Sequence, residues 1–236
     1  MKIMLLTDLV LTRRTLIQLV VMCACMVAFI CIFTETVATI GASFTTMLPL
    51  FYLFTITAYD ESNNWQAYRL SLPLSRNTTS LGRYACFLLV VLGSMLLGAL
   101  ISYVMCIIGT ALGPNVPFLA PFTFENNPPI IIWGSSALGA AAALFIASIT
   151  LPFVSKMGMT KGVRFIPVAF ALILLLLFTL FSDEGPFAAF VPDFLYYLTT
   201  DDSAISLFIA LTTLVSIVTF VISMAISLKL YQKREL

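Results

Sequence analysis

Long uninterrupted apolar runs constrain this chain more than any other feature of its sequence. Six can be read directly, at about 16–33, 40–58, 85–112, 130–153, 165–181 and 205–228. A helix needs roughly 20 apolar residues to cross the hydrocarbon core of a bilayer, and these runs are continuous rather than alternating. They therefore predict membrane-spanning helices, of which the third is long enough to tilt strongly or to extend beyond the membrane.

The overall composition agrees with a membrane protein. The chain has 236 residues, of which 61% are hydrophobic and only 10% are charged. A soluble domain carries about 25% charged residues, because its surface faces water. We therefore expect one all-α, polytopic transmembrane domain over residues 1–236, embedded in the lipid bilayer.

The basic residues predict how the spans are oriented. With a cytoplasmic N-terminus, all twelve Lys and Arg fall on the inner side, three at each place: Lys2, Arg13, Arg14; Arg69, Arg76, Arg83; Lys156, Lys161, Arg164; Lys229, Lys233, Arg234. The predicted outer segments instead carry acidic residues, namely Glu35, Glu125, Asp183, Glu184, Asp193, Asp201 and Asp202. Because cytoplasmic loops are enriched in Lys and Arg, this predicts six spans with both termini in the cytoplasm. The net charge of +1 gives no reason to expect a nucleic acid partner.

Few residues could perform chemistry. The chain has no His, the commonest general base and metal ligand, and its six apolar runs contain no Asp, Glu, Lys or Arg. This argues against an intramembrane hydrolase and against an ion-coupled carrier, so we predict no catalytic residue and no metal site. The phosphate-binding pattern G-x-x-x-x-G-K-[ST] is also missing, so if ATP drives this protein, the ATPase is another chain.

The fourth run has a face of small residues. They recur every four positions, at Ser135, Gly139, Ala143 and Ala147. Small faces let membrane helices approach closely, and this one could pack either within the chain or against a second subunit. Pro49, Pro152 and Pro167 are predicted to kink or end their helices.

Three segments outside the runs also have distinct compositions. Residues 1–15 mix apolar and charged side chains, which predicts a helix on the inner membrane surface. Residues 182–204 place aromatic residues between acidic ends, which predicts an external, partly re-entrant helical element before the last span. The Pro-rich segment 113–129 is predicted to be an irregular external loop.

The cytoplasmic segment between the second and third runs predicts a short amphipathic helix over residues 60–72. Asp60 can cap its start, with Glu61 in the first turn, and Pro73 ends it. Ser75 can cap the next helix, which would begin near Arg76.

Aromatic residues mark one face of this segment. Trp65, Tyr68 and Leu72 share that face, and Arg69 lies on another side. Such a helix could rest at the headgroup level of the membrane. It could also dock onto a cytoplasmic partner, since aromatic residues and Arg dominate binding hot spots.

The same segment resembles a known family. The pattern Asp60-Glu61…Trp65…Tyr68…Ser71-Leu72-Pro73-Leu74-Ser75-Arg76…Arg83-Tyr84 is similar to the cytoplasmic loop of bacterial type-2 ABC transporter permeases. More narrowly, it resembles the small six-span permeases that export peptides and lipophilic toxins. Those proteins carry a Lys-Tyr pair before the third span, where this chain has Arg83-Tyr84 and keeps the charge. The six-span layout, the cytoplasmic ends, the N-terminal helix and the external element extend the likeness over the whole chain.

The resemblance implies half of an ATP-driven exporter in a bacterial plasma membrane. Two such permeases, identical or paralogous, would each receive a separate cytoplasmic ATPase subunit, which would bind the ATP and Mg, so no cofactor is expected in this chain. Residues 60–72 would form the coupling helix, and the coupling residues would be Asp60, Glu61, Trp65, Tyr68, Arg69, Leu72, Pro73, Arg76 and Tyr84. The expected substrate is an amphipathic peptide, an antimicrobial compound or a lipid. The alternatives are a non-transporting scaffold or sensor subunit and a secondary carrier, which the uncharged spans disfavour.

Overall fold

The computed structural model describes residues 2–34, 36–62, 76–113, 116, 119–157 and 202–232. These residues form five helices and their connections: α1 (Lys2–Thr34), α2 (Val37–Ser62), α4 (Arg76–Leu112), α5 (Pro129–Met157) and α8 (Asp202–Gln232). Each helix contains a stretch long and apolar enough to cross a membrane. The predicted fifth run (165–181), the predicted external element (182–204) and most of the predicted coupling helix lie outside the described residues.

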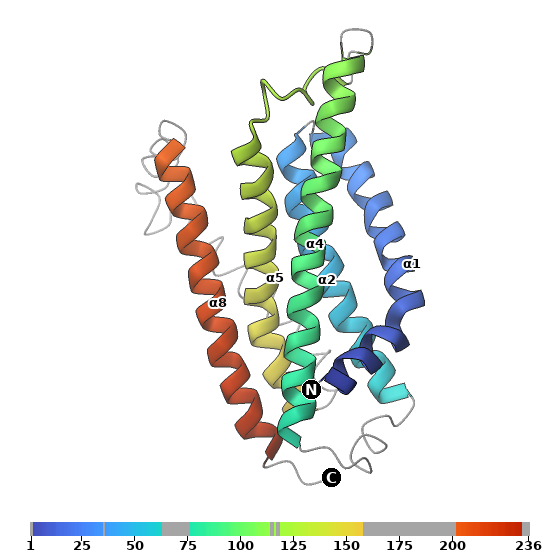
Figure 1. The fold of residues 1–236 in the computed structure, drawn as a ribbon, viewed down its shortest axis with the longest axis vertical. Coiled ribbons are helices and arrows are strands. Elements are labelled where there is room, and N and C mark those ends of the chain that lie inside the picture. Colours follow the sequence, from blue (N-terminus) through green and yellow to red (C-terminus); the bar gives the residue numbers. More distant parts are fainter. Residues whose placement is uncertain are drawn as a thin grey trace, which may run out of the picture.

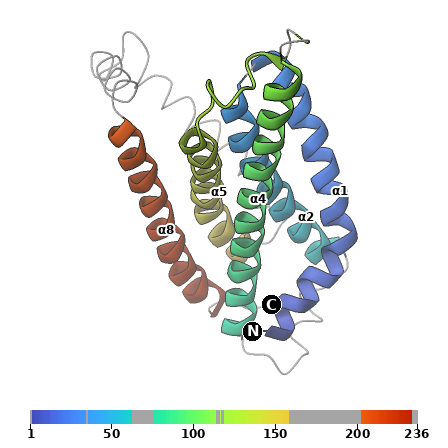
Figure 2. The same ribbon diagram turned by 45° about the horizontal axis from the view of Figure 1, so that its top comes forward.

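The helices α1, α2, α4 and α5 run alternately in opposite directions within one bundle, and α8 runs in the same direction as α5 (Figure 1). The starts of α1 and α4 and the ends of α2, α5 and α8 lie at the lower end of that view. α2 packs against α1, α4 and α5, and α5 also packs against α4 and α8, so α1 and α8 lie at the two edges (Figure 2). α5 ends and α8 begins at opposite ends of the bundle, which is the arrangement that one further span between them requires. The six-span count stays a prediction.

The N-terminal segment is helical but is not separate from the first span. α1 continues for 33 residues, from Lys2 to Thr34. Its first turns bend inward, toward the start of α4 (Figures 1 and 2). Near the bend, the hydroxyls of Thr15 and Tyr59 lie 3.3 Å apart, which ties α1 to the last turns of α2. Whether residues 1–15 lie on the membrane surface stays a prediction.

The third span is a long helix, as its long apolar run predicts. α4 has 37 residues, of which Ser80–Leu112 form the candidate span. At 1.5 Å per residue the helix is roughly 55 Å long, well beyond the roughly 30 Å hydrocarbon core. Its first turns, beginning at Arg76, therefore extend past the membrane or the helix tilts within it.

Residues 119–128, in the loop after α4, make contacts with one another and with α4. Asn127 Nδ2 donates hydrogen bonds to the carbonyl oxygens of Pro121 (3.0 Å) and Thr123 (3.2 Å). Phe122 is fully buried, and its carbonyl oxygen would clash with a Cβ atom placed on Gly109. Only Gly fits at this position of α4, so the loop caps the upper end of the bundle.

Pro49 lies inside α2 and does not end it. Because Pro has no N–H, the carbonyl group of Thr45, four residues earlier, loses its usual helical donor. Ser94 Oγ of α4 lies 3.4 Å from that carbonyl oxygen and 2.8 Å from the carbonyl oxygen of Val91 in its own helix, and it can donate its proton to either. Thr45 Oγ1 donates to the Ser94 carbonyl at 3.4 Å. A neighbouring helix thus offers a donor to the group that the proline leaves free.

Candidate functional site

The predicted coupling segment connects two helix ends on one side of the bundle. α2 ends at Ser62 and α4 begins at Arg76, both at the lower end in Figure 1. Asp60 and Glu61 lie in the last turn of α2, rather than in the first turn of a new helix as expected, because no Gly or Pro follows Pro49 in α2 before Ser62. α4 begins directly after the predicted cap, Ser75. The structure does not describe residues 63–75, so the roles of Trp65, Tyr68, Arg69, Leu72 and Pro73 stay predictions.

Tyr84, the last predicted coupling residue, lies between α4 and α8. Its side chain is only 3% exposed, and its hydroxyl lies 3.0 Å from Ser223 Oγ. Its ring packs against that of Phe220 at a centroid distance of 5.2 Å, and the ring of Phe87 stacks on that of Phe220 at 6.1 Å. The beginning of α4 is therefore tied to α8 by an aromatic cluster and a hydrogen bond. A displacement of this part of α4 would act directly on α8.

The small face of α5 is buried within the chain. All four predicted packing residues, Ser135, Gly139, Ala143 and Ala147, are buried. A Cβ atom on Gly139 would lie 2.5 Å from the carbonyl oxygen of Ala42, and Thr46 Oγ1 donates to the Gly139 carbonyl at 3.3 Å. This part of the face is therefore occupied by α2.

Two further glycines bring α2 and α4 close to α5. A Cβ atom on Gly41 would lie 2.7 Å from Ser136 Oγ, and one on Gly98 would lie 2.6 Å from Thr45 Oγ1. Ser136 Oγ is buried and has no hydrogen-bond partner in the part of the chain that the structure describes. Sequence reasoning missed these residues, although small and hydroxyl side chains in the second and third runs were the available signal. Together they form the tightest crossing among α2, α4 and α5.

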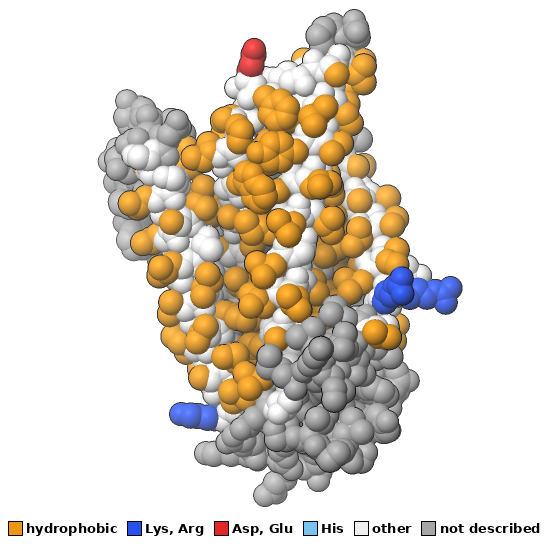
Figure 3. Space-filling model, viewed as in Figure 1, with side chains coloured by type: hydrophobic (Ala, Val, Ile, Leu, Met, Phe, Trp, Pro, Cys, Tyr) orange, Lys and Arg blue, Asp and Glu red, His pale blue; other side chains and the backbone are white. Residues whose placement is uncertain are grey.

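Charged side chains lie outside a broad apolar belt. Figure 3 shows Lys and Arg side chains at the right edge, a little below mid-height, and at the lower left, and an acidic side chain at the top, with apolar side chains between them. The described basic residues are Arg13 and Arg14 of α1, Arg83 of α4 and Lys229 of α8, and the described acidic residue is Glu125 in the loop before α5. The end that carries the α2–α4 connection is thus the basic end.

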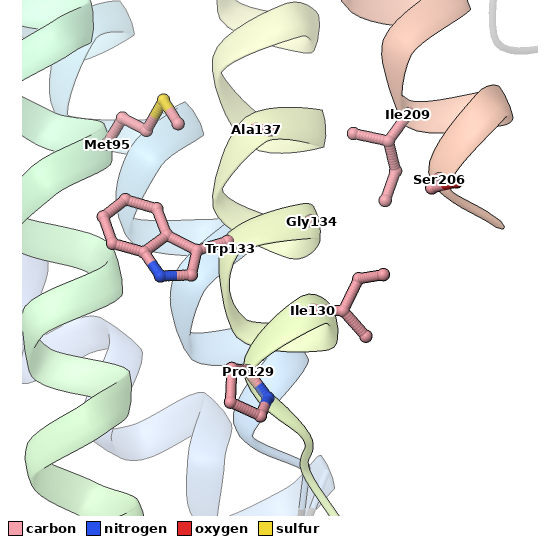
Figure 4. Close-up of a pocket in the computed structure, with 8 residues that line it drawn as sticks. All are labelled: Met95, Pro129, Ile130, Trp133, Gly134, Ala137, Ser206 and Ile209. Atoms are coloured by element: carbon pink, nitrogen blue, oxygen red, sulfur yellow. The ribbon is translucent and has the colours of Figure 1, made fainter. Parts of the chain in front are cut away.

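An apolar groove lies on α5 toward the opposite end. Its volume is about 370 Å³, and it is lined by Met95, Pro129, Ile130, Trp133, Gly134, Ala137, Ser206 and Ile209. In Figure 4, Trp133 and Met95 lie on one side of α5, and Ile209 and Ser206 lie on the other. The ring of Tyr103 lies 6.4 Å from that of Trp133, which is 42% exposed. α4 and α8, joined near Tyr84, diverge toward this end (Figures 1 and 2).

Neither region resembles a catalytic centre. Among the residues that the structure describes, no group of three or more His, Cys, Asp and Glu side chains could hold a metal ion. The groove is lined by apolar side chains and one hydroxyl, so it can bind apolar surface but offers no acid, base or fixed charge.

One comparison with known proteins finds a family. The model of a family described as "ABC-2 family transporter protein" matches residues 3–232, which include nearly all of the chain and all five described helices. No curated protein and no solved structure matches the chain.

Proposed function

Because the chain belongs to the ABC-2 family of transporter proteins, we propose that it is the permease subunit of an ATP-driven exporter. It is a multi-pass protein of the plasma membrane, with at least five helices able to span the bilayer. The family match over residues 3–232 is the observation that carries the proposal. The export direction, the energy source and the substrate go beyond that match, and each has its own support.

The energy source is a separate ATPase that docks at the basic end of the bundle. Lys and Arg are enriched on the cytoplasmic side of membrane proteins, so the end near Arg13, Arg14 and Lys229 faces the cytoplasm. The connection between α2 and α4 leaves the bundle at that end. A cytoplasmic ATPase can therefore reach residues 60–72, with Trp65 and Tyr68 as anchors. This chain has no phosphate-binding loop of its own.

The contact between α4 and α8 would carry this motion into the membrane. An ATPase that displaces the start of α4 acts on α8 through Tyr84, which packs on Phe220 and is hydrogen-bonded to Ser223. α8 forms one wall of the apolar groove on α5, and α4 forms the other. A change in the angle between the two helices therefore changes the width of the groove.

The groove supports an amphipathic substrate. Its lining is almost wholly apolar. The ring of Trp133 contacts that of Tyr103, which in turn contacts Phe124, and aromatic residues are common at the membrane interface. An amphipathic peptide, antimicrobial compound or lipid could place its apolar side here and keep its polar side outside. Two permease subunits would complete the transporter, with the exposed apolar side chains of α8, such as Leu207 and Leu214, facing lipid or the second subunit.

Reconstitution with a candidate ATPase tests the proposal. The full chain and the ATPase are purified together, and ATP hydrolysis is measured in vesicles with and without candidate amphipathic substrates. Replacing both Trp65 and Tyr68 with Ala should reduce the permease-dependent stimulation at least fivefold while the chain still inserts. Phe29→Ala is the matched control, because it removes an exposed aromatic side chain of α1 and should leave the stimulation unchanged.

Two results would contradict the proposal. If the doubly substituted chain binds and stimulates the ATPase as well as the original, residues 60–72 are not the coupling element. If the unmodified chain does not associate with any ATPase, the non-transporting scaffold becomes the better interpretation.

A further inference from the structure

A second cavity lies between α1, α2 and α4. Its volume is about 280 Å³, and it is lined by Ala24, Val27, Ala28, Cys31, Ile40, Phe44, Ile101 and Met105. Its floor is deeply buried, since Ile40 and Phe44 are 2% and 0% exposed. Ala28 is exposed at its mouth, and Ala24, Ile101 and Met105 are half-buried. The cavity is therefore a crevice that opens outward between α1 and α4.

The crevice lies at the depth of the membrane hydrocarbon. All eight lining residues belong to the candidate spans Thr12–Cys31, Val37–Tyr59 and Ser80–Leu112. Its floor is close to the upper ends of α1 and α2 in Figure 1, so it lies in the half of the membrane away from the basic end. At this depth the medium outside its mouth is lipid rather than water. A void here would leave the lining side chains without contact partners on one side.

The lining excludes most kinds of occupant. All eight side chains are apolar, with Cys31 acting as a small hydrophobic residue, so a water molecule would find none of the two to four side-chain partners it needs. A peptide backbone would bury polar groups unpaired, at several kcal/mol each. A helix, roughly 10 Å across with its side chains, is too wide for a crevice of this volume.

A hydrocarbon chain meets these requirements. Apolar cavities of about 150 Å³ are large enough to bind benzene, and this crevice is nearly twice that size. We propose that the crevice between α1 and α4 binds one acyl chain of a membrane lipid, drawn from the leaflet away from the basic end. Its room comes from Ala24 and Ala28, whose short side chains leave space beside the aromatic ring of Phe44. The bound chain completes the packing of α1, which lies at the edge of the bundle. This inference rests on the membrane location and not on the proposed export function.

Photolabelling from the lipid tests this site. The full chain is placed in vesicles of phosphatidylethanolamine and phosphatidylglycerol that contain a trace of phosphatidylglycerol with a diazirine in the middle of one acyl chain. After irradiation, labelled residues are located by mass spectrometry. Leu214, which is 61% exposed on α8, reports contact with the surrounding lipid. We expect Phe44 and Ile40 to be labelled at least as strongly as Leu214, although the surrounding lipid alone could not reach them.

Two variants make the test specific. Ala28→Trp should fill the mouth and lower the labelling of Phe44 at least fivefold, with that of Leu214 unchanged. Val21→Trp is the matched control, since Val21 lies on α1 but does not line the crevice, and it should leave both signals unchanged. If Ala28→Trp fails to fold, as judged by its gel-filtration profile, Ala24→Phe serves the same purpose.

The outcomes separate the lipid from other occupants. Labelling of Leu214 without Phe44 would overturn the proposal, and so would labelling of Phe44 that persists in the filled variants. A crosslink from the crevice to a second copy of the chain, or to residues 158–201, would show that protein covers it instead. None of these results depends on ATP hydrolysis or export.

Discussion

Replacing Gly139 with Ala should loosen the contact between α5 and α2. A Cβ atom at this position would lie 2.5 Å from the carbonyl oxygen of Ala42 and 3.1 Å from Thr45 Cβ. The carbonyl belongs to the backbone of α2 and cannot rotate away as a side chain would. To reach ordinary van der Waals contact, the two helices must therefore separate locally by roughly 0.9 Å.

The magnitude follows from two opposing effects. Overpacking of this kind costs about 1–3 kcal/mol, and a gap approaching 1 Å also removes a large part of the dispersion energy at neighbouring contacts. In the other direction, Ala favours a helix over Gly by up to about 1 kcal/mol. We expect a net loss of about 1–2 kcal/mol, which corresponds to a thermal midpoint lowered by roughly 2–8 °C for a chain of this length.

Thermal unfolding in detergent with a thiol-reactive dye measures this change. Four cysteines are buried, namely Cys23, Cys31, Cys86 and Cys106, so they react only as the bundle opens, and the exposed Cys25 sets the baseline. Two other glycine substitutions serve as controls. Among the described residues, a Cβ atom on Gly93 would have nothing within 4 Å, and one on Gly134 would meet only the flexible end of Ile209. Gly93→Ala should be neutral or slightly stabilising, and Gly134→Ala should cost less than Gly139→Ala.

The order of stability of the three variants tests whether α5 and α2 approach closely at Gly139. A Gly139→Ala chain that is as stable as Gly93→Ala would refute the close approach of α5 and α2. A Gly134→Ala chain that is less stable than Gly139→Ala would place the tightest contact of α5 against α8 instead.

Two more substitutions test contacts between helices. Ser94→Ala should destabilise the bundle by about 0.5–1.5 kcal/mol, because it removes a side-chain donor to the Thr45 carbonyl. The loss should be smaller in a Pro49→Ala background, where a backbone N–H is restored. Equal losses of thermal midpoint in the two backgrounds would contradict this prediction. Tyr84→Phe should keep the aromatic packing and lose only the hydrogen bonds of the hydroxyl with Ser223 and Ser227, about 0.5–1 kcal/mol. Tyr84→Ala should cost roughly 3–5 kcal/mol by the same assay, and similar losses for both would mean that the ring contributes little.

Helix positions were readable because they depend on local properties. A continuous apolar run has to form its hydrogen bonds within itself when it lies in lipid, so its length and type follow directly from the sequence. Five of the six predicted spans each lie inside a helix of the structure, namely 16–33, 40–58, 85–112, 130–153 and 205–228. The helices extend further than the apolar runs, as α4 does by starting at Arg76, because hydrogen bonding continues until a breaking residue is reached.

The boundary between α2 and the polar segment that follows it was harder to predict. Asp60 is a good capping residue, which favoured a new helix beginning there. A capping side chain matters only where a helix actually starts, and α2 had not yet ended. The family resemblance carried by this segment agrees with the family match, although its residues from Trp65 to Pro73 lie outside the described part of the chain.

The sequence by itself determined that this chain crosses a membrane, where most of its helices lie and which family it resembles. It did not determine which side of each helix faces the interior. Leu96 of α4 is 61% exposed and Leu144 of α5 is 5% exposed, although both are leucines within spans. Lipid tails are as apolar as leucine, so burial in the bundle is not driven by hydrophobicity and leaves no amphipathic pattern to read. The close crossing at Gly41, Gly98 and Gly139, the groove on α5 and the crevice beside α1 follow from shape and hydrogen bonding between helices, which only the tertiary structure decides.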